Sequence, residues 1–160
     1  MIRNAFRHTC ARVRRRVGDG ERGSALVEFI VIGVLLTLPV FYLVITLARL
    51  QAGTYAVAAA ARESSRMFVT APSDAAGATR SQAAAALAFR DQGFGGQGSV
   101  RVACTRSPCL SPDGTIDSAA DLDVPLPLIP DFLRGAVPSS VHLHSRHAES
   151  VDRYRAPGTP

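Results

Sequence analysis

At 160 residues the chain is long enough for one membrane span and one small domain, and too short for several domains. Its formal charge is +5, but the excess is confined to residues 1–23, which hold seven Arg and two acids, whereas residues 24–160 hold eleven Arg and eleven acids. The balanced remainder offers no basic excess to a phosphate backbone, so we expect no nucleic acid among the partners.

Residues 1–23 form a basic, polar leader that contains Cys10 and ends in the sequence GDGERG. The glycines predict a flexible segment, suited to entering a protease in extended form. Basic residues beside a membrane span stay in the cytoplasm, so we expect the N-terminus inside and the rest of the chain outside. A twin-arginine signal at residues 14–16 and a signal-peptidase site near residues 56–58 are alternatives. Both fit poorly, because a cleavable apolar region has about 7–15 residues and this one is longer.

Residues 25–48 are apolar apart from one acidic side chain, Glu28. A helix of this length, at about 1.5 Å per residue, exceeds a hydrocarbon core of about 30 Å, so we predict one transmembrane helix over residues 24–48, in contact with the lipid bilayer. A carboxylate one turn into such a span costs about 2–3 kcal/mol unless it is paired. Glu28 therefore needs a cation, or else it reaches the interface from the first helical turn, where an acid is favoured. Pro39 removes one helical hydrogen bond and predicts a kink.

The junction between leader and span carries a short motif, Gly23-Ser24 followed by Glu28-Phe29. It resembles the processing motif of type IV pilin-like proteins of the Flp/Tad class. The resemblance implies that a prepilin peptidase cuts after Gly23 on the cytoplasmic side and that Ser24 becomes the new N-terminus. It also implies that Glu28, with Phe29 beside it, seats the mature subunit. The carboxylate would pair with the amine freed at Ser24, either its own or that of an adjacent subunit.

Beyond Arg49 the helical pattern continues without a break as far as Pro72. Apolar positions recur at helical spacing, at Leu50, Thr54, Val57, Ala61 and Phe68. We therefore predict one helix over residues 25–68, with an Ala-rich stalk outside the membrane within residues 49–71. Small side chains let another helix approach closely, which suits packing either against sister subunits or against the chain's own second helix.

Residues 72–150 predict a small α+β domain. Ser73 suits the N-cap of a second helix that ends near Asp91 and has an apolar side at residues 83–87 and Phe89. Three later segments alternate polar and apolar residues, at 100–104, 122–126 and 141–146. We expect a three-stranded antiparallel sheet with one face on the helices, and Pro125 at an edge strand or a strand end. Residues 151–160 predict a frayed, flexible tail.

Few residues suggest chemistry. Cys104 and Cys109 flank a proline-containing turn outside the membrane, where thiols oxidise, and are a possible disulfide. His142 and His144 share a strand face while His147 points the other way, so we expect no metal site. The sequence shows no catalytic constellation and no phosphate-binding loop, so we expect neither an enzyme nor a cofactor.

The layout as a whole resembles a TadE-like pseudopilin, most specifically over residues 22–66, where the passage AARESSR at 60–66 looks like the stretch that follows the span in that family. The resemblance implies a minor pilin or pseudopilin of a Tad-type (Flp) pilus assembly or secretion system. Its implied partners are the prepilin peptidase, other pilin or pseudopilin subunits and the Tad inner-membrane assembly platform. The implied location is the cytoplasmic membrane as a single-pass protein, with the cell surface or pilus as a further destination. The alternative is a signal-anchored extracytoplasmic domain with no pilus role, which binds a ligand through the loop around Phe132; that loop is otherwise a lid on the sheet or a subunit contact.

Overall fold

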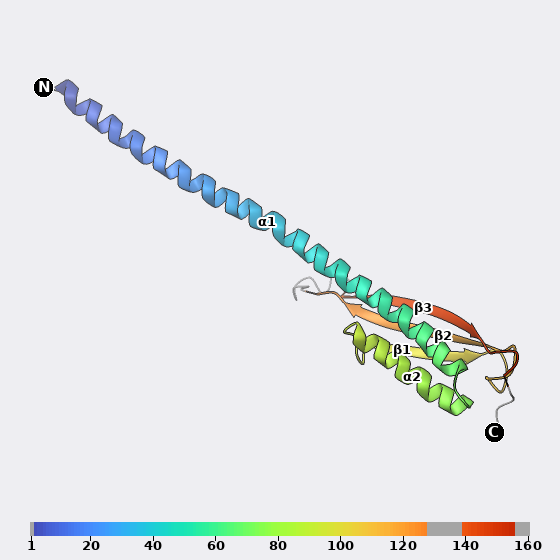
Figure 1. Cartoon of the computed structure of the whole chain (residues 1–160). Helices are drawn as coiled ribbons and strands as arrows, with labels where there is room; N and C mark the ends of the chain where they lie inside the picture. The colour runs from blue at the N-terminus through green and yellow to red at the C-terminus, as the bar shows by residue number, and fades with distance from the viewer. Residues whose placement is uncertain (1, 128–138, 156–160) are drawn as a thin grey trace. The chain divides into compact units, whose positions relative to one another are not determined.

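The computed structural model describes residues 2–127 and 139–155, with side chains described from Ser24 onward. Its elements in chain order are the helices α1 (Ile2–Val69) and α2 (Asp74–Asp91) and the strands β1 (Gly98–Cys104), β2 (Thr115–Pro125) and β3 (Ser140–Ser150) (Figure 1). The chain divides into two compact units, Met1–Val44 and Ile45–Pro160, and α1 contributes to both. Two helices and one antiparallel sheet confirm the α+β class.

The first helix begins earlier than residue 25, where we predicted its start. Backbone of α1 is helical from Ile2, including the stretch that we expected to be flexible. No proline interrupts residues 2–23, and a glycine inside a helix costs only about 1 kcal/mol relative to alanine. Pro39 lies inside α1 and does not end it.

The second helix begins and ends where the sequence predicts. Ser73 is its N-cap, and the Ser73 hydroxyl accepts a hydrogen bond from the Ala76 amide at 3.3 Å. Its apolar side was predicted correctly only at Ala85 and Phe89, because the buried residues recur every four positions, at Gly77, Ser81, Ala85 and Phe89. That spacing turns Ala83, Ala86 and Leu87 away from the sheet, and all three are exposed.

The sheet has the strand order β1-β2-β3, with both pairs antiparallel. Its central strand begins at Thr115, seven residues before the predicted segment. The prediction missed this part of the strand because the passage Asp117-Ser118-Ala119-Ala120 lacks an alternation of polar and apolar residues. Small residues suffice there, since Ser118 and Ala120 are on the buried face together with Leu122 and Val124. Pro125 is the last residue of β2, so of the two predicted places for this proline the strand end is correct.

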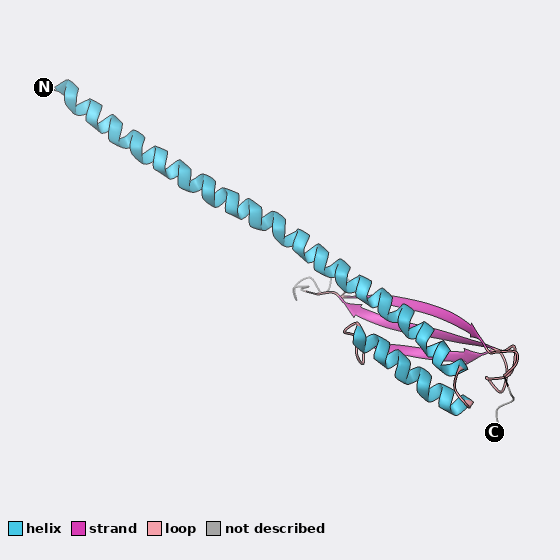
Figure 2. Cartoon of the chain, viewed as in Figure 1, coloured by secondary structure: helices cyan, strands magenta, loops and turns pink. Residues whose placement is uncertain are grey.

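Both helices cover one face of the sheet (Figure 2). The main core joins Val57 of α1, Phe89 of α2 and the inner-face side chains Leu122 and Val124 of β2. Helix α1 approaches the sheet closely at Gly53, where a Cβ would stand 2.6 Å from Val124 Cγ2 and 2.7 Å from Leu143 Cδ1. Only glycine fits at that contact.

Candidate functional site

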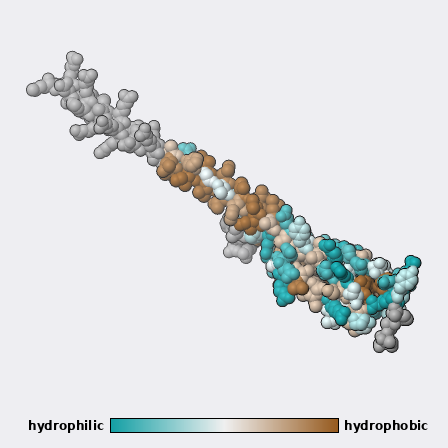
Figure 3. All heavy atoms as spheres, in the orientation of Figure 1, coloured by the Kyte–Doolittle hydropathy of each residue, from teal (hydrophilic) through white to brown (hydrophobic). Residues whose placement is uncertain are grey.

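The apolar segment, residues 26–47 of α1, exposes nearly all of its large side chains. Leu35 is 73% exposed and Phe29 is 75% exposed, and the residues that share this exposure are Leu26, Val27, Ile30, Val31, Ile32, Val34, Leu36, Leu38, Val40, Phe41, Leu43, Val44 and Leu47. They form the brown band of Figure 3. Within Ser24–Val69 this is the one stretch of the described chain that is long and apolar enough to cross a membrane, judged by length and composition. Such a large apolar surface is unfavourable in water and favourable in hydrocarbon.

The predicted processing junction lies at the N-terminal end of that segment. Gly23 is a helical residue of α1, Ser24 follows it, and Ser24, Glu28 and Phe29 are all exposed. Among the side chains that the structure describes, none forms a hydrogen bond or an ion pair with the Glu28 carboxylate. Ser24 and Glu28 are four residues apart in one helix, so they lie on the same face, one turn from each other.

The small residues of the stalk are buried inside the unit Ile45–Pro160. In the AARESSR passage Ala60, Ala61, Ser64 and Ser65 are fully buried, while the two arginines point outward. Of the two predicted uses of these small side chains, packing inside the domain is the one observed, in a core that includes residues of both α2 and the sheet. Ser64 and Ser118 each bury a hydroxyl that has no hydrogen-bond partner among the residues that the structure describes.

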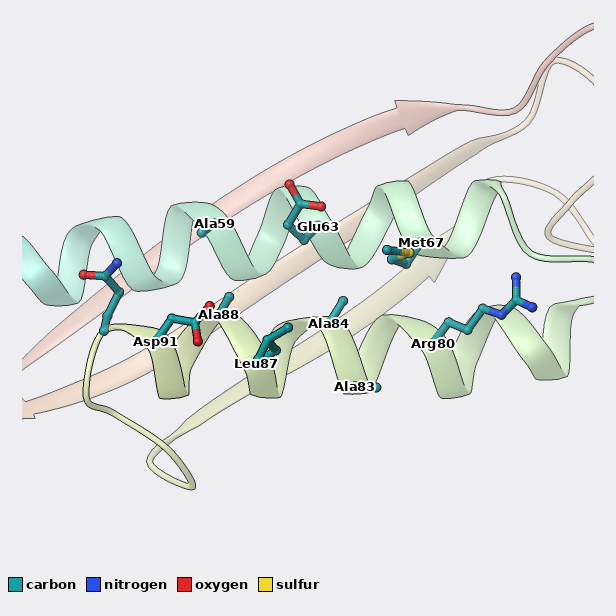
Figure 4. Close-up of a pocket in the computed structure, with 10 residues that line it drawn as sticks. Ala59, Glu63, Met67, Arg80, Ala83, Ala84, Leu87, Ala88 and Asp91 are labelled. Atoms are coloured by element: carbon teal, nitrogen blue, oxygen red, sulfur yellow. The ribbon is translucent and has the colours of Figure 1, made fainter.

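A groove of about 470 Å³ runs between the stalk and α2 (Figure 4). Its lining is mostly the methyl groups of alanines with two longer apolar side chains, Met67 and Leu87, and it also includes four polar side chains. The lining residues are Ala59, Glu63, Met67, Arg80, Ala83, Ala84, Leu87, Ala88, Asp91 and Gln92. The exposed Leu87, which we predicted to face the core, belongs to this groove instead.

The end of the domain near Val69 is tied together by several polar contacts. A disulfide joins Cys104 and Cys109, and the Asp74 carboxylate at the start of α2 accepts hydrogen bonds from the amides of Cys109 (2.8 Å) and Leu110 (3.2 Å). The Arg155 guanidinium donates to the carbonyl oxygens of Val69 and Ala71, satisfying the end of α1.

Residues 151–155 are therefore not the frayed segment that we predicted. Val151 is buried, and its amide donates to the Gly114 carbonyl at 2.8 Å. Residues 156–160 of the predicted tail, and Phe132 with its loop, lie outside the described residues.

The outer face of the sheet carries an ion-pair cluster that the sequence did not predict. His142 Nδ1 lies 3.0 Å from Asp123 Oδ1, and His144 Nδ1 lies 2.8 Å from Asp121 Oδ1. Arg101 pairs with Asp121 at 2.8 Å from the other side. The hydrogen bond from His144, helped by the Arg101 guanidinium, holds the pKa of Asp121 below its ordinary value. The alternation of Asp121 and Asp123 along β2 was the available signal.

His147 lies on the opposite strand face from His142 and His144, as predicted, and contacts Glu149 at 3.2 Å. Within residues 24–127 and 139–155, no three His, Cys, Asp or Glu side chains are grouped so that they could hold a metal ion. No family model, curated protein or solved structure matches this chain. The cut after Gly23 and the seating role of Glu28 stay predictions.

Proposed function

We propose that this chain is a minor pilin or pseudopilin subunit of a Tad-type (Flp) pilus assembly or secretion system, made as a prepilin that is cut between Gly23 and Ser24. The observation that carries the proposal is the placement of Glu28. It is the single charged side chain of the apolar segment, it has no partner among the described side chains, and it follows Ser24 by one helical turn.

The energetics of Glu28 favour a role beyond anchoring. An unpaired carboxylate inside a span costs about 2–3 kcal/mol, and a plain membrane anchor gains nothing from it. Cleavage before Ser24 would create an ammonium group at the start of the helix, on the same face as the carboxylate. The pair would offset the burial of both charges, either within one subunit or between neighbours.

The second unit supports a location outside the cytoplasm. Disulfides persist in oxidising compartments and are rare in the cytosol, so the Cys104–Cys109 bond fits a domain on the far side of the membrane. The basic leader, with seven Arg before the span, favours the same orientation. In this topology the prepilin peptidase and the assembly platform meet the leader and span, while other subunits meet both the span and the domain.

A signal-anchored binding domain is the second candidate, and the groove between α1 and α2 favours it. A concave, mostly apolar site of about 470 Å³ has the size of a small-ligand pocket. This function needs neither a cut at Gly23 nor a charge at Glu28.

Replacement of Glu28 by Gln distinguishes the two functions. We expect Glu28→Gln to insert and to be cut as before, because it removes a charge from the span, but to lose crosslinking to other pilins and pilus assembly. Glu63→Gln, which removes an acid from the stalk instead, is the matched control and should assemble normally. Normal piliation by Glu28→Gln cells, in a strain where the protein is required for pili, would refute the seating role.

A further inference from the structure

The two edge strands of the sheet differ in what lies beside them. An open sheet presents unpaired backbone N–H and C=O groups along each edge strand, and these groups can pair with another strand. In the order β1-β2-β3 the edge strands are β1 and β3. What covers each edge therefore decides where a further strand can bind.

The register of β3 against β2 identifies which residues of β3 direct their backbone groups outward. The Leu126 amide donates to the Ser139 carbonyl (2.9 Å) and the Val151 amide donates to the Gly114 carbonyl (2.8 Å), one at each end of the ladder between β2 and β3. Hydrogen-bonded pairs alternate along an antiparallel ladder, so the odd-numbered residues of β3 bond to β2. The outward N–H and C=O groups belong to Ser140, His142, His144, Arg146, Ala148 and Ser150.

Helix α2 covers part of the opposite edge, at β1. The Thr105 amide donates to Thr115 at 3.1 Å, so the even-numbered residues of β1 direct their backbone groups away from β2. One of these groups, the Val100 carbonyl, accepts a hydrogen bond from Gln82 Nε2 of α2 at 3.2 Å. Helix α2 packs beside this strand and protects its edge.

The β3 edge has no such cover in the part of the chain that the structure describes. None of the hydrogen bonds among residues 24–127 and 139–155 reaches the outward groups of β3. The strand has 11 residues, about 37 Å at 3.4 Å per residue, and contains no proline. A long, regular and uncapped edge is a template for strand addition.

The side chains along this edge define the charge of a suitable partner. The outward residues also place His142, His144 and Arg146 on the outer face, at every second position. Asp123 and Asp121 contact the two histidines from β2, whereas Arg146 has no ion pair in the described structure. The exposed Arg146 charge is thus left for an acid on the open side.

A second copy of β3 fits less well. If the β3 strands of two copies paired antiparallel with Ser145 at the centre, His144 of each copy would lie opposite Arg146 of the other. Two basic residues directly opposite each other destabilise a ladder. An acidic side chain opposite Arg146 instead gains a cross-strand ion pair.

We propose that the β3 edge binds an extended segment of another protein, with an acidic side chain opposite Arg146, by adding it as a fourth strand. Backbone hydrogen bonds to the even-numbered residues of β3 give the affinity, and Arg146 selects the acid. This inference goes beyond the pilin proposal and holds whether or not the leader is cut.

Hydrogen exchange on the full chain in detergent tests the proposal directly. The probe is a synthetic peptide of about nine residues, alternating Glu with Val or Thr, which spans most of β3. In the free protein the amides of residues 142, 144, 146 and 148 should exchange fast and the odd-numbered amides of β3 slowly. Saturation with peptide should protect the even-numbered amides and leave the odd-numbered amides unchanged.

Two variants separate backbone pairing from charge. Ala148→Pro removes one outward N–H and no bond of the β2 ladder, so it should keep the fold and weaken peptide binding about tenfold. Arg146→Gln should weaken binding about fivefold, while Arg66→Gln, which removes an exposed arginine from α1, should change it less than about twofold. If Ala148→Pro fails to fold, Arg146→Gln and the exchange pattern still decide.

Several outcomes would overturn the inference. One is the absence of protection at about 1 mM peptide, and another is equal binding of a Lys-for-Glu peptide. Even-numbered amides that are already protected in the free protein also contradict it. If that protection rises with protein concentration the occupant is a second copy, and if it does not the edge is covered by the chain itself.

Discussion

The two halves of helix α1 differ in which side chains are buried: large ones are exposed in one half, and small ones are buried in the other. In the apolar segment (26–47) the large residues are exposed, whereas in residues 53–68 the buried positions are mostly Gly, Ala and Ser. Ala56, for example, is 0% exposed and Leu35 is 73% exposed. Small side chains let the backbone approach the sheet, and large ones with nothing against them need an apolar surrounding. The same secondary structure therefore serves two environments, and the side chains show where one gives way to the other.

Two glycines test this comparison with the largest expected effect. Gly53→Leu should lower the stability of the domain by about 3 kcal/mol, because any side chain there overlaps Val124 and Leu143. Gly33→Leu, in the apolar segment, should have almost no effect, since a Cβ at Gly33 meets nothing within 4 Å. Thermal unfolding of the full chain in detergent, followed by circular dichroism, measures both. Equal losses at the two positions would break the comparison.

The disulfide is the next largest contribution and concerns the domain alone. Replacing Cys104 and Cys109 together by Ser should lower its stability by about 2 kcal/mol, the entropy of closing so short a loop. The effect should appear as a lower denaturant midpoint, whereas Cys10→Ser should leave the midpoint in place. Addition of a reductant to the wild-type chain should reproduce the double variant, and an unchanged midpoint in the reduced protein would refute this account.

The buried serine hydroxyls of the stalk should have a smaller effect on stability. Ser64→Ala should raise stability by about 1 kcal/mol, because it removes an unpaired polar group and improves helix propensity. Ser65→Ala is the control at the neighbouring buried position, where the hydroxyl donates to the Arg62 carbonyl at 2.9 Å and should give no gain. A loss of stability in Ser64→Ala would show that the hydroxyl has a partner, such as a buried water.

The smallest expected effect concerns the outer face of the sheet, which carries charged side chains, in contrast to the apolar segment. The folded-state pKa of Asp121 lies below its ordinary value of 3.8, so its contribution is present above that pH and is lost as the pH falls through the folded pKa. Asp121→Asn should lower the free energy of unfolding by about 0.5 kcal/mol at pH 7, and should have no effect at a pH below the folded-state pKa of Asp121. Denaturation curves of both proteins at pH 7 and at pH 2 measure the difference, and a cost that grows on acidification would contradict the assignment.

The sequence was informative wherever the signal is local. The apolar segment, the Ser73 cap and the end of β2 at Pro125 each depend on a few neighbouring residues. The start of β2 could not be predicted, because Ser118 and Ala120 are buried through close packing rather than through hydrophobicity. The bonds of Arg155 to Val69 and Ala71 join residues more than eighty positions apart, which no local pattern shows.

The candidate site divides in the same way. The processing junction at Gly23 and Glu28 was predicted from its motif and its place beside the apolar segment, and it stays a prediction. The acids that hold His142 and His144 come from another strand, so only the register of the folded sheet brings them together.

The central claim is that the apolar segment becomes the N-terminal end of a processed subunit. Its most direct test is the intact mass of the chain after coexpression with a prepilin peptidase. We predict a product that begins at Ser24 and has lost residues 1–23, and no cleavage when Gly23 is replaced by Leu, because a small flexible residue must enter the protease. A full-length mature chain, or a product cut near Ala58, would contradict the claim.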